Sequence, residues 1–193
     1  PVSSHTHGSA KAFKDKPHPI NMNAREVALA GLFVALTAVS AQIQVPLGPV
    51  PFTLQVFAVL LSGMLLGARL GFTSQALYVL AGAVGLPVFA GFTGGFAHLY
   101  GPTGGYLLAF PITSLLAGLF AERSKRMEAW FLGSILGIGV IYLLGWLRLG
   151  LYLGGYFGKA FAVGVLPFVP FDMVKVVLAV GVAKAVKRAL TWL

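Results

Sequence analysis

Long apolar stretches separated by a few charged residues are the main pattern of this 193-residue chain. No Lys, Arg, Asp or Glu occurs in the 42 residues from Val27 to Ala68 or in the 52 residues from Leu70 to Ala121. A third uncharged stretch covers the 19 residues 129–147, and the 24 residues 160–183 contain only two charges. A helix that crosses a bilayer needs about 20 apolar residues, so the first two stretches predict two spans each and the last two predict one each. The pattern therefore predicts six transmembrane helices.

Proline and glycine residues divide the two longest stretches. The segment 45–51 contains three prolines, and it cannot be helical throughout because proline lacks the amide hydrogen and clashes with the preceding turn. Glycine and proline at 85–87 and at 101–105 bracket a second loop. The predicted spans cover about 26–44, 52–67, 70–86, 105–121, 129–148 and 168–187.

Composition narrows the class of protein. Hydrophobic residues make up 58% of the chain and charged residues only 10%, against about 25% charged residues in ordinary soluble domains. A soluble protein so poor in charge would leave large apolar patches exposed. We therefore predict an all-α integral membrane protein with the lipid bilayer as its surroundings. The chain has no cysteine, which excludes disulfides and thiolate metal sites.

The net charge of +9 is explained by orientation in the membrane. If the N-terminus is inside, eleven of the fourteen Lys and Arg residues lie on the inner side, as the positive-inside rule requires. The excess of basic over acidic residues therefore requires no nucleic-acid partner to explain it. An even number of spans places both termini in the cytoplasm. We interpret the polar residues 1–21 as a disordered, tag-derived tail, and residues 22–193 as one six-helix domain that starts at Met22.

Asp172 and Lys175 are the strongest candidates for a functional site. An ionisable residue inside a span costs at least about 2.5 kcal/mol on insertion scales, so it indicates function by default. At a spacing of three residues the two side chains share one helix face and can neutralise each other. Pro170 favours a helix start just before them, and a helix start attracts anions. Together these features predict a carboxylate-binding site, and a purely structural ion pair is the alternative.

Three weaker features lie outside this pair. Thr53 and Gln55 open the second span and either hydrogen-bond a polar, uncharged part of a ligand or cap the helix. The loop 89–106 is rich in glycine and aromatic residues and forms either a lid or an interfacial aromatic belt; its His98 is assigned no role. The first span carries a stripe of small residues, which suits either packing within the chain or a docking face for another membrane subunit. The stripe consists of Ala24, Ala28, Gly31, Ala35 and Ala38.

Several motifs are missing from the sequence. Gly158-Lys159-Ala160 lacks the glycine and the Ser/Thr of a phosphate-binding loop, so we expect no ATP site in this chain. Apart from Glu26 at the first position of the first span, Asp172 is the only acid in the predicted spans, and no pattern typical of membrane-embedded hydrolysis occurs. We therefore expect a binding protein without catalytic residues, metal or cofactor. The alternative is a membrane enzyme with Asp172 and Lys175 as its acid and base.

Four segments together resemble the BioY family. They are Val50-Pro51-Phe52-Thr53-Leu54-Gln55, 85–91 (Gly-Leu-Pro-Val-Phe-Ala-Gly), 101–106 (Gly-Pro-Thr-Gly-Gly-Tyr) and 167–175, which ends in Asp172-Met173-Val174-Lys175. They occur in the order and at the spacing of that family, and the resemblance covers about residues 24–188.

The resemblance implies a specific function. BioY proteins are the biotin-specific substrate-binding (S) components of energy-coupling factor (ECF) transporters, a kind of ABC transporter. They have six helices, lie in the prokaryotic plasma membrane, and join a transmembrane coupling protein and two cytoplasmic ATPases. The resemblance places Asp172 and Lys175 at the biotin carboxylate and Thr53, Gln55, Tyr106 and the backbone of Gly104 and Gly105 in the pocket. It also favours Ala24, Ala28, Gly31 and Ala35 as the docking face. An S component or carrier for another small carboxylate vitamin is the alternative.

Overall fold

The helices of the computed structural model, which describes residues 22–190, follow the predicted spans closely. The all-α fold is thereby confirmed, whereas the tail predicted for residues 1–21 lies outside the described residues. Six helices correspond to the six predicted spans: α1 (Ala24–Gln42), α2 (Gln55–Leu66), α3 (Ala68–Ala83), α5 (Gly104–Arg123), α6 (Met127–Tyr152) and α8 (Val169–Leu190).

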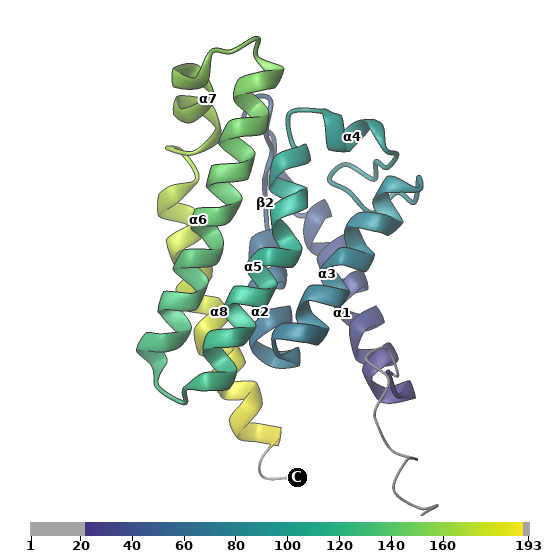
Figure 1. The fold of residues 1–193 in the computed structure, drawn as a ribbon, viewed down its shortest axis with the longest axis vertical. Helices are drawn as coiled ribbons and strands as arrows, with labels where there is room; N and C mark the ends of the chain where they lie inside the picture. Colours follow the sequence, from purple (N-terminus) through teal and green to yellow (C-terminus); the bar gives the residue numbers. More distant parts are fainter. Residues whose placement is uncertain (1–21, 191–193) are drawn as a thin grey trace, which may run out of the picture.

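Short elements gather at one end of this bundle (Figure 1). The proline-rich segment after α1 forms a small antiparallel hairpin of β1 (Gln44–Val45) and β2 (Phe52–Thr53). Two short helices, α4 (Ala97–Tyr100) and α7 (Phe157–Gly164), lie at the same end. The hairpin brings the start of α2 back beside the end of α1.

The lengths of the helices differ from those of six equal spans. Within residues 22–190, three helices are long and apolar enough to cross a membrane, namely α1, α5 and α6, and the pair α7–α8, bent by 47°, gives a fourth. Helix α2 has only 12 residues, which reach about 18 Å and cannot cross a hydrocarbon core of about 30 Å alone. The hairpin takes up residues before Gln55, and Gly67 ends the helix at φ 85°. The count of six crossings stays a prediction.

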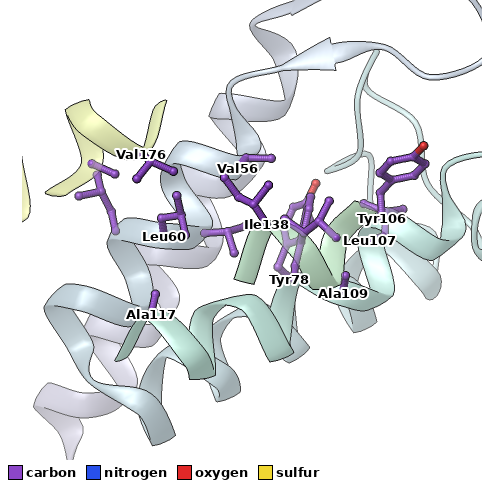
Figure 2. Close-up of a cluster of buried hydrophobic side chains, with 14 of the residues drawn as sticks. Val56, Leu60, Tyr78, Tyr106, Leu107, Ala109, Ala117, Ile138 and Val176 are labelled. Carbon is purple, nitrogen blue, oxygen red and sulfur yellow. The ribbon is translucent and has the colours of Figure 1, made fainter. Parts of the chain in front are cut away.

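Helix α5 is the centre of the bundle, and it packs most extensively on α6, α3 and α2. Glycines permit the close approach of these helices. A Cβ at Gly63 of α2 would collide with the backbone of Ser114 in α5, and one at Gly118 would lie 2.5 Å from the backbone nitrogen of Ala68. Apolar side chains from α2, α3, α5, α6 and α8 fill the remaining space as one cluster (Figure 2).

A buried polar network crosses the same core. The side chain of Gln75 in α3 is fully buried, and its Nε2 donates hydrogen bonds of 3.1 Å to Thr37 Oγ1 in α1 and to Ser62 Oγ in α2. Ser62 in turn shares a hydrogen bond of 2.8 Å with Ser114 in α5. Because buried polar groups are costly unless they are paired, this network fixes the relative positions of four helices.

The charged residues are distributed unequally between the two ends of the bundle. The start of α1, the α5–α6 connection and the end of α8 lie at the same end (Figure 1). Arg25, Lys125 and Arg188 belong to these segments, whereas Lys159 is in α7 at the opposite end. This distribution agrees with the predicted orientation, and the assignment of that end to the cytoplasm stays a prediction.

Candidate functional site

A cavity of about 420 Å³ lies among the first turns of α2, α5 and α8, the middle of α6, and the segments 49–53 and 89–103. Its walls are mainly apolar, and they include side chains from α2, α5 and α6 together with aromatic rings from the loops. A few polar groups gather on one part of the wall. The apolar wall includes Val56, Phe89, Phe110, Ile141 and Phe168; the polar part includes Thr53, Gln55, Tyr142, Asp172 and Lys175. Volume and lining are typical of a small-molecule site.

Asp172 and Lys175 lie together on the first turns of α8, as their spacing predicts, and both line the cavity. The side chains of Asp172 and Lys175 are only 4% and 6% exposed, and Lys175 Nζ lies 2.7 Å from Asp172 Oδ1. The Asp–Lys pair is therefore a buried salt bridge in the wall of the cavity.

Two further contacts hold the ammonium group of Lys175. It donates a hydrogen bond of 2.6 Å to the backbone oxygen of Thr53, and it lies 4.0 Å from the ring centroid of Phe52. Both partners belong to β2, so the hairpin positions the cation. An ammonium has three N–H donors. Lys175 uses one for Asp172 Oδ1 and one for the backbone oxygen of Thr53, which leaves one for a ligand.

Tyr142 of α6 completes the polar part of the site. Its hydroxyl donates a hydrogen bond of 2.7 Å to Asp172 Oδ2, so each carboxylate oxygen of Asp172 accepts one charge-assisted hydrogen bond. Sequence reasoning missed Tyr142 because it lies in an apolar run, 30 residues from Asp172. No local signal marks it.

Thr53 and Gln55 lie side by side in the cavity wall and are joined by a hydrogen bond of 2.9 Å from Thr53 Oγ1 to Gln55 Oε1. Gln55 Nε2 donates a hydrogen bond of 2.6 Å to the hydroxyl of Tyr78 in α3. Both roles considered for these residues have support: the two side chains line the cavity, and Thr53 Oγ1 accepts a hydrogen bond of 3.3 Å from the backbone nitrogen of Gln55, the first residue of α2.

Tyr106 lines the cavity, whereas Gly104 and Gly105 are not among its lining residues. The hydroxyl of Tyr106 donates a hydrogen bond of 2.9 Å to the backbone oxygen of Gly164. A Cβ at Gly104 would collide with the backbone of Leu99, and one at Gly105 with that of Leu144. The resemblance led us to expect these two glycines at the pocket. In the structure they lie where backbone segments approach one another, next to the lining residues Thr103 and Tyr106.

The aromatic loop has residues that suit each of the two roles considered for it. Phe89, Ala90, Thr93 and His98 contribute to the cavity wall, as residues of a lid would. Phe92, Phe96 and Tyr100 point outward and are at least 60% exposed, as residues of an interfacial belt would be. His98, which received no role from the sequence, is a lining residue and lies edge-on to Phe89.

Four of the five residues of the small-residue stripe on α1 do not pack within the described part of the chain, whereas Ala38 is half-buried against the core. Ala24, Ala28, Gly31 and Ala35 are all exposed, and a Cβ at Gly31 would meet nothing within 4 Å. The opposite face of α1, including Phe33 and Thr37, is buried against the bundle. The interpretation as internal packing is therefore wrong for these four residues.

A helical bundle with apolar outer faces and a mainly apolar cavity that holds a salt bridge defines a membrane protein that binds a small molecule. Within residues 22–190 no group of three or more His, Asp or Glu is close enough to hold a metal ion.

Comparisons with known proteins identify the family. The family model described as "BioY family" matches residues 13–192, and the chain belongs to this family. It is 54% identical over 163 residues to the "Probable biotin transporter BioY" of Pyrococcus horikoshii, covering 84% of this chain and 96% of that protein. It is 50% identical over 165 residues to the "Biotin transporter BioY" of Thermotoga maritima, covering 85% and 96%.

A solved structure confirms the fold. The crystal structure of the S-component for biotin from an ECF-type ABC transporter superposes with a TM-score of 0.80 and covers 87% of this chain and 95% of that chain. At 24% sequence identity this likeness supports the S-component fold.

Proposed function

We propose that this protein binds biotin in the cavity described above and serves as the S component of an ECF-type transporter for biotin uptake. The observation that carries the proposal is the match of the BioY family over residues 13–192, in a chain whose cavity contains a buried Asp–Lys pair. The transporter names of its relatives support uptake and not catalysis.

The chemistry of the cavity suits biotin. Biotin has a fused, mainly apolar ring system, an alkyl chain, an uncharged ureido group and one carboxylate. The aromatic and aliphatic walls suit the ring and chain, and Thr53, Gln55 and Tyr106 add neutral hydrogen-bonding groups. We include all three residues, with Asp172 and Lys175, in the proposed biotin site, and Gly104 and Gly105 support it only through packing.

The balance of charge favours the ureido group at the Asp–Lys pair. Asp172 already neutralises Lys175 at 2.7 Å, so a second carboxylate placed there would be repelled by Asp172. The ureido oxygen accepts a hydrogen bond from the remaining N–H of Lys175, and a ureido N–H donates to Asp172. The pair thus presents one donor and one acceptor to a group that needs both. The sequence-based assignment of the carboxylate to the same pair is the competing pose.

Transport requires partners that supply energy. We propose that a transmembrane coupling protein and two cytoplasmic ATPases associate with this chain in the prokaryotic plasma membrane, with both termini in the cytoplasm. The exposed stripe Ala24, Ala28, Gly31 and Ala35 supports this proposal, because small residues let a helix of another subunit approach closely.

Titration calorimetry of the purified protein tests the proposal. We expect biotin to bind below micromolar concentration and to be recovered unchanged, whereas thiamine and riboflavin give no heat of binding. Thiamine lacks the ureido group that we place at the Asp–Lys pair. Failure to bind biotin would contradict the function, binding of another carboxylate vitamin would favour the related S component, and chemical conversion of biotin would favour the enzyme.

A further inference from the structure

We infer that Gln42 and Tyr78, neither of which lines the cavity, hold the segment 88–93 over it and so set how fast a bound ligand leaves. This inference rests on the proposed function in one respect, namely that biotin is the ligand. The segment matters because its residues Phe89, Ala90 and Thr93 form part of the cavity wall, and they belong to a loop and not to one of the long helices.

Gln42, the last residue of α1, holds the segment by two backbone atoms. Its Nε2 donates a hydrogen bond of 3.0 Å to the oxygen of Phe89, and its Oε1 accepts one of 2.9 Å from the nitrogen of Phe92. The same Nε2 also donates to the oxygen of Ala38, one turn earlier, at 3.0 Å. The carboxamide is thus fixed on its own helix and paired with the loop much as a neighbouring strand would be.

The backbone of this segment needs such support. Phe92 has φ 55°, and it is the only non-glycine residue with a positive φ among residues 22–190. A bulky residue in this region is strained and persists only where its surroundings hold it. Phe92 is 72% exposed, so its restraints are backbone ones: the hydrogen bond from its amide to Gln42, and the bridge between Phe89 and Thr93 that closes the turn around it.

Tyr78 of α3 holds the other end of the segment. Its fully buried hydroxyl donates a hydrogen bond of 2.9 Å to the oxygen of Val88 and accepts one of 2.6 Å from Gln55 Nε2. Because Gln55 and its partner Thr53 line the cavity, Tyr78 connects the loop to the polar wall of the site. Gln42 and Tyr78 therefore act as positioning residues for the cover of the cavity.

The variants Gln42→Leu and Tyr78→Phe remove these hydrogen bonds with little change in volume. Gln44→Leu is a matched control, since the side chain of Gln44 lies beside Gly91 of the same segment but forms no hydrogen bond with the described residues. Two measurements are needed on the full chain: amide hydrogen exchange at Phe92 without ligand, and the rate at which bound biotin leaves in a chase with unlabelled biotin. We expect Gln42→Leu to speed exchange at Phe92 and to raise the dissociation rate about tenfold or more, as the loss of two hydrogen bonds implies.

Each outcome decides one claim. We expect Tyr78→Phe to raise the dissociation rate as well, and Gln44→Leu to change neither quantity. Exchange and dissociation rates equal to those of the Gln44→Leu control would overturn the inference. If the unaltered protein does not bind biotin, the proposed function fails, and exchange at Phe92 alone then decides whether Gln42 holds the segment.

Discussion

The hydroxyl of Tyr142 lies 2.7 Å from Asp172 Oδ2, so a side chain of α6 holds the carboxylate that balances Lys175 on α8. The two residues are 30 positions apart, and the other oxygen of Asp172 is occupied by Lys175. Tyr142 thereby orients the acceptor that we assign to a ureido N–H of biotin.

Replacing Tyr142 by Phe removes this hydrogen bond and keeps the ring. A hydrogen bond to a charged group contributes about 1.5–3 kcal/mol, so we expect biotin affinity to fall roughly 10- to 100-fold by calorimetry. The exposed Tyr152, at the end of the same helix, is the control: Tyr152→Phe should bind biotin normally. Unchanged affinity in Tyr142→Phe would exclude Tyr142 from the biotin site.

Lys175→Ala tests which part of biotin meets the Asp–Lys pair. If the ureido group is bound there, the variant weakens biotin and its uncharged amide by similar factors, because both keep the ureido ring. Titration of both ligands into the variant measures the two factors. A much larger loss for biotin than for the amide would place the carboxylate at Lys175 instead.

The same salt bridge can be separated into its contributions to folding and to binding. Lys175→Met alone leaves Asp172 buried without its cation, which costs about 3–5 kcal/mol. The double variant Asp172→Asn/Lys175→Met removes both charges, so we expect thermal unfolding near that of the unaltered protein while biotin binding is still lost. Recovery of binding in the double variant would show that the pair is purely structural.

Much of the fold follows from the spacing of charges along the chain. The uncharged stretches predicted helices in the right places because each helix must present apolar residues to lipid or to the core. The salt bridge was predictable for the same reason: a charge within an apolar span is costly and therefore conspicuous.

Other features depend on packing between distant segments. Tyr142 contributes a hydroxyl to the site only because α6 lies against α8, and its own neighbours in sequence give no sign of this. Gly104 and Gly105 lie beside other backbone segments, and the sequence does not reveal this because glycine permits the approach of a ligand and of a second segment equally well. The length of α2 also depends on the hairpin before Gln55, which an apolar stretch does not reveal.

The exposed stripe on α1 predicts a separation of binding from transport. Ala28→Trp or Ala35→Trp adds bulk on the outer surface, so biotin affinity should stay unchanged while uptake with the coupling protein and ATPases falls severalfold or more. Leu36→Trp is the control, because Leu36 is also exposed on α1 but lies about 100° around the helix from Ala35. Loss of biotin binding in the stripe variants would contradict a docking role.

Gly63 offers a test of how closely α2 and α5 must pack. A Cβ at this position would collide with the backbone oxygen of Ser114, which cannot rotate away as a side chain could. Gly63→Ala should therefore lower the free energy of unfolding by about 1–3 kcal/mol, the usual cost of overpacking.

In α6, Gly139 has nothing within 4 Å of an added Cβ, so Gly139→Ala should be neutral or stabilising by up to about 1 kcal/mol through helix propensity. Thermal unfolding of both variants in the same detergent measures the contrast. Because Ser114 also hydrogen-bonds Ser62, separation of the two helices would disturb the polar network of Gln75 as well. Equal stability of the two variants would show that the α2–α5 contact is more tolerant than the geometry implies.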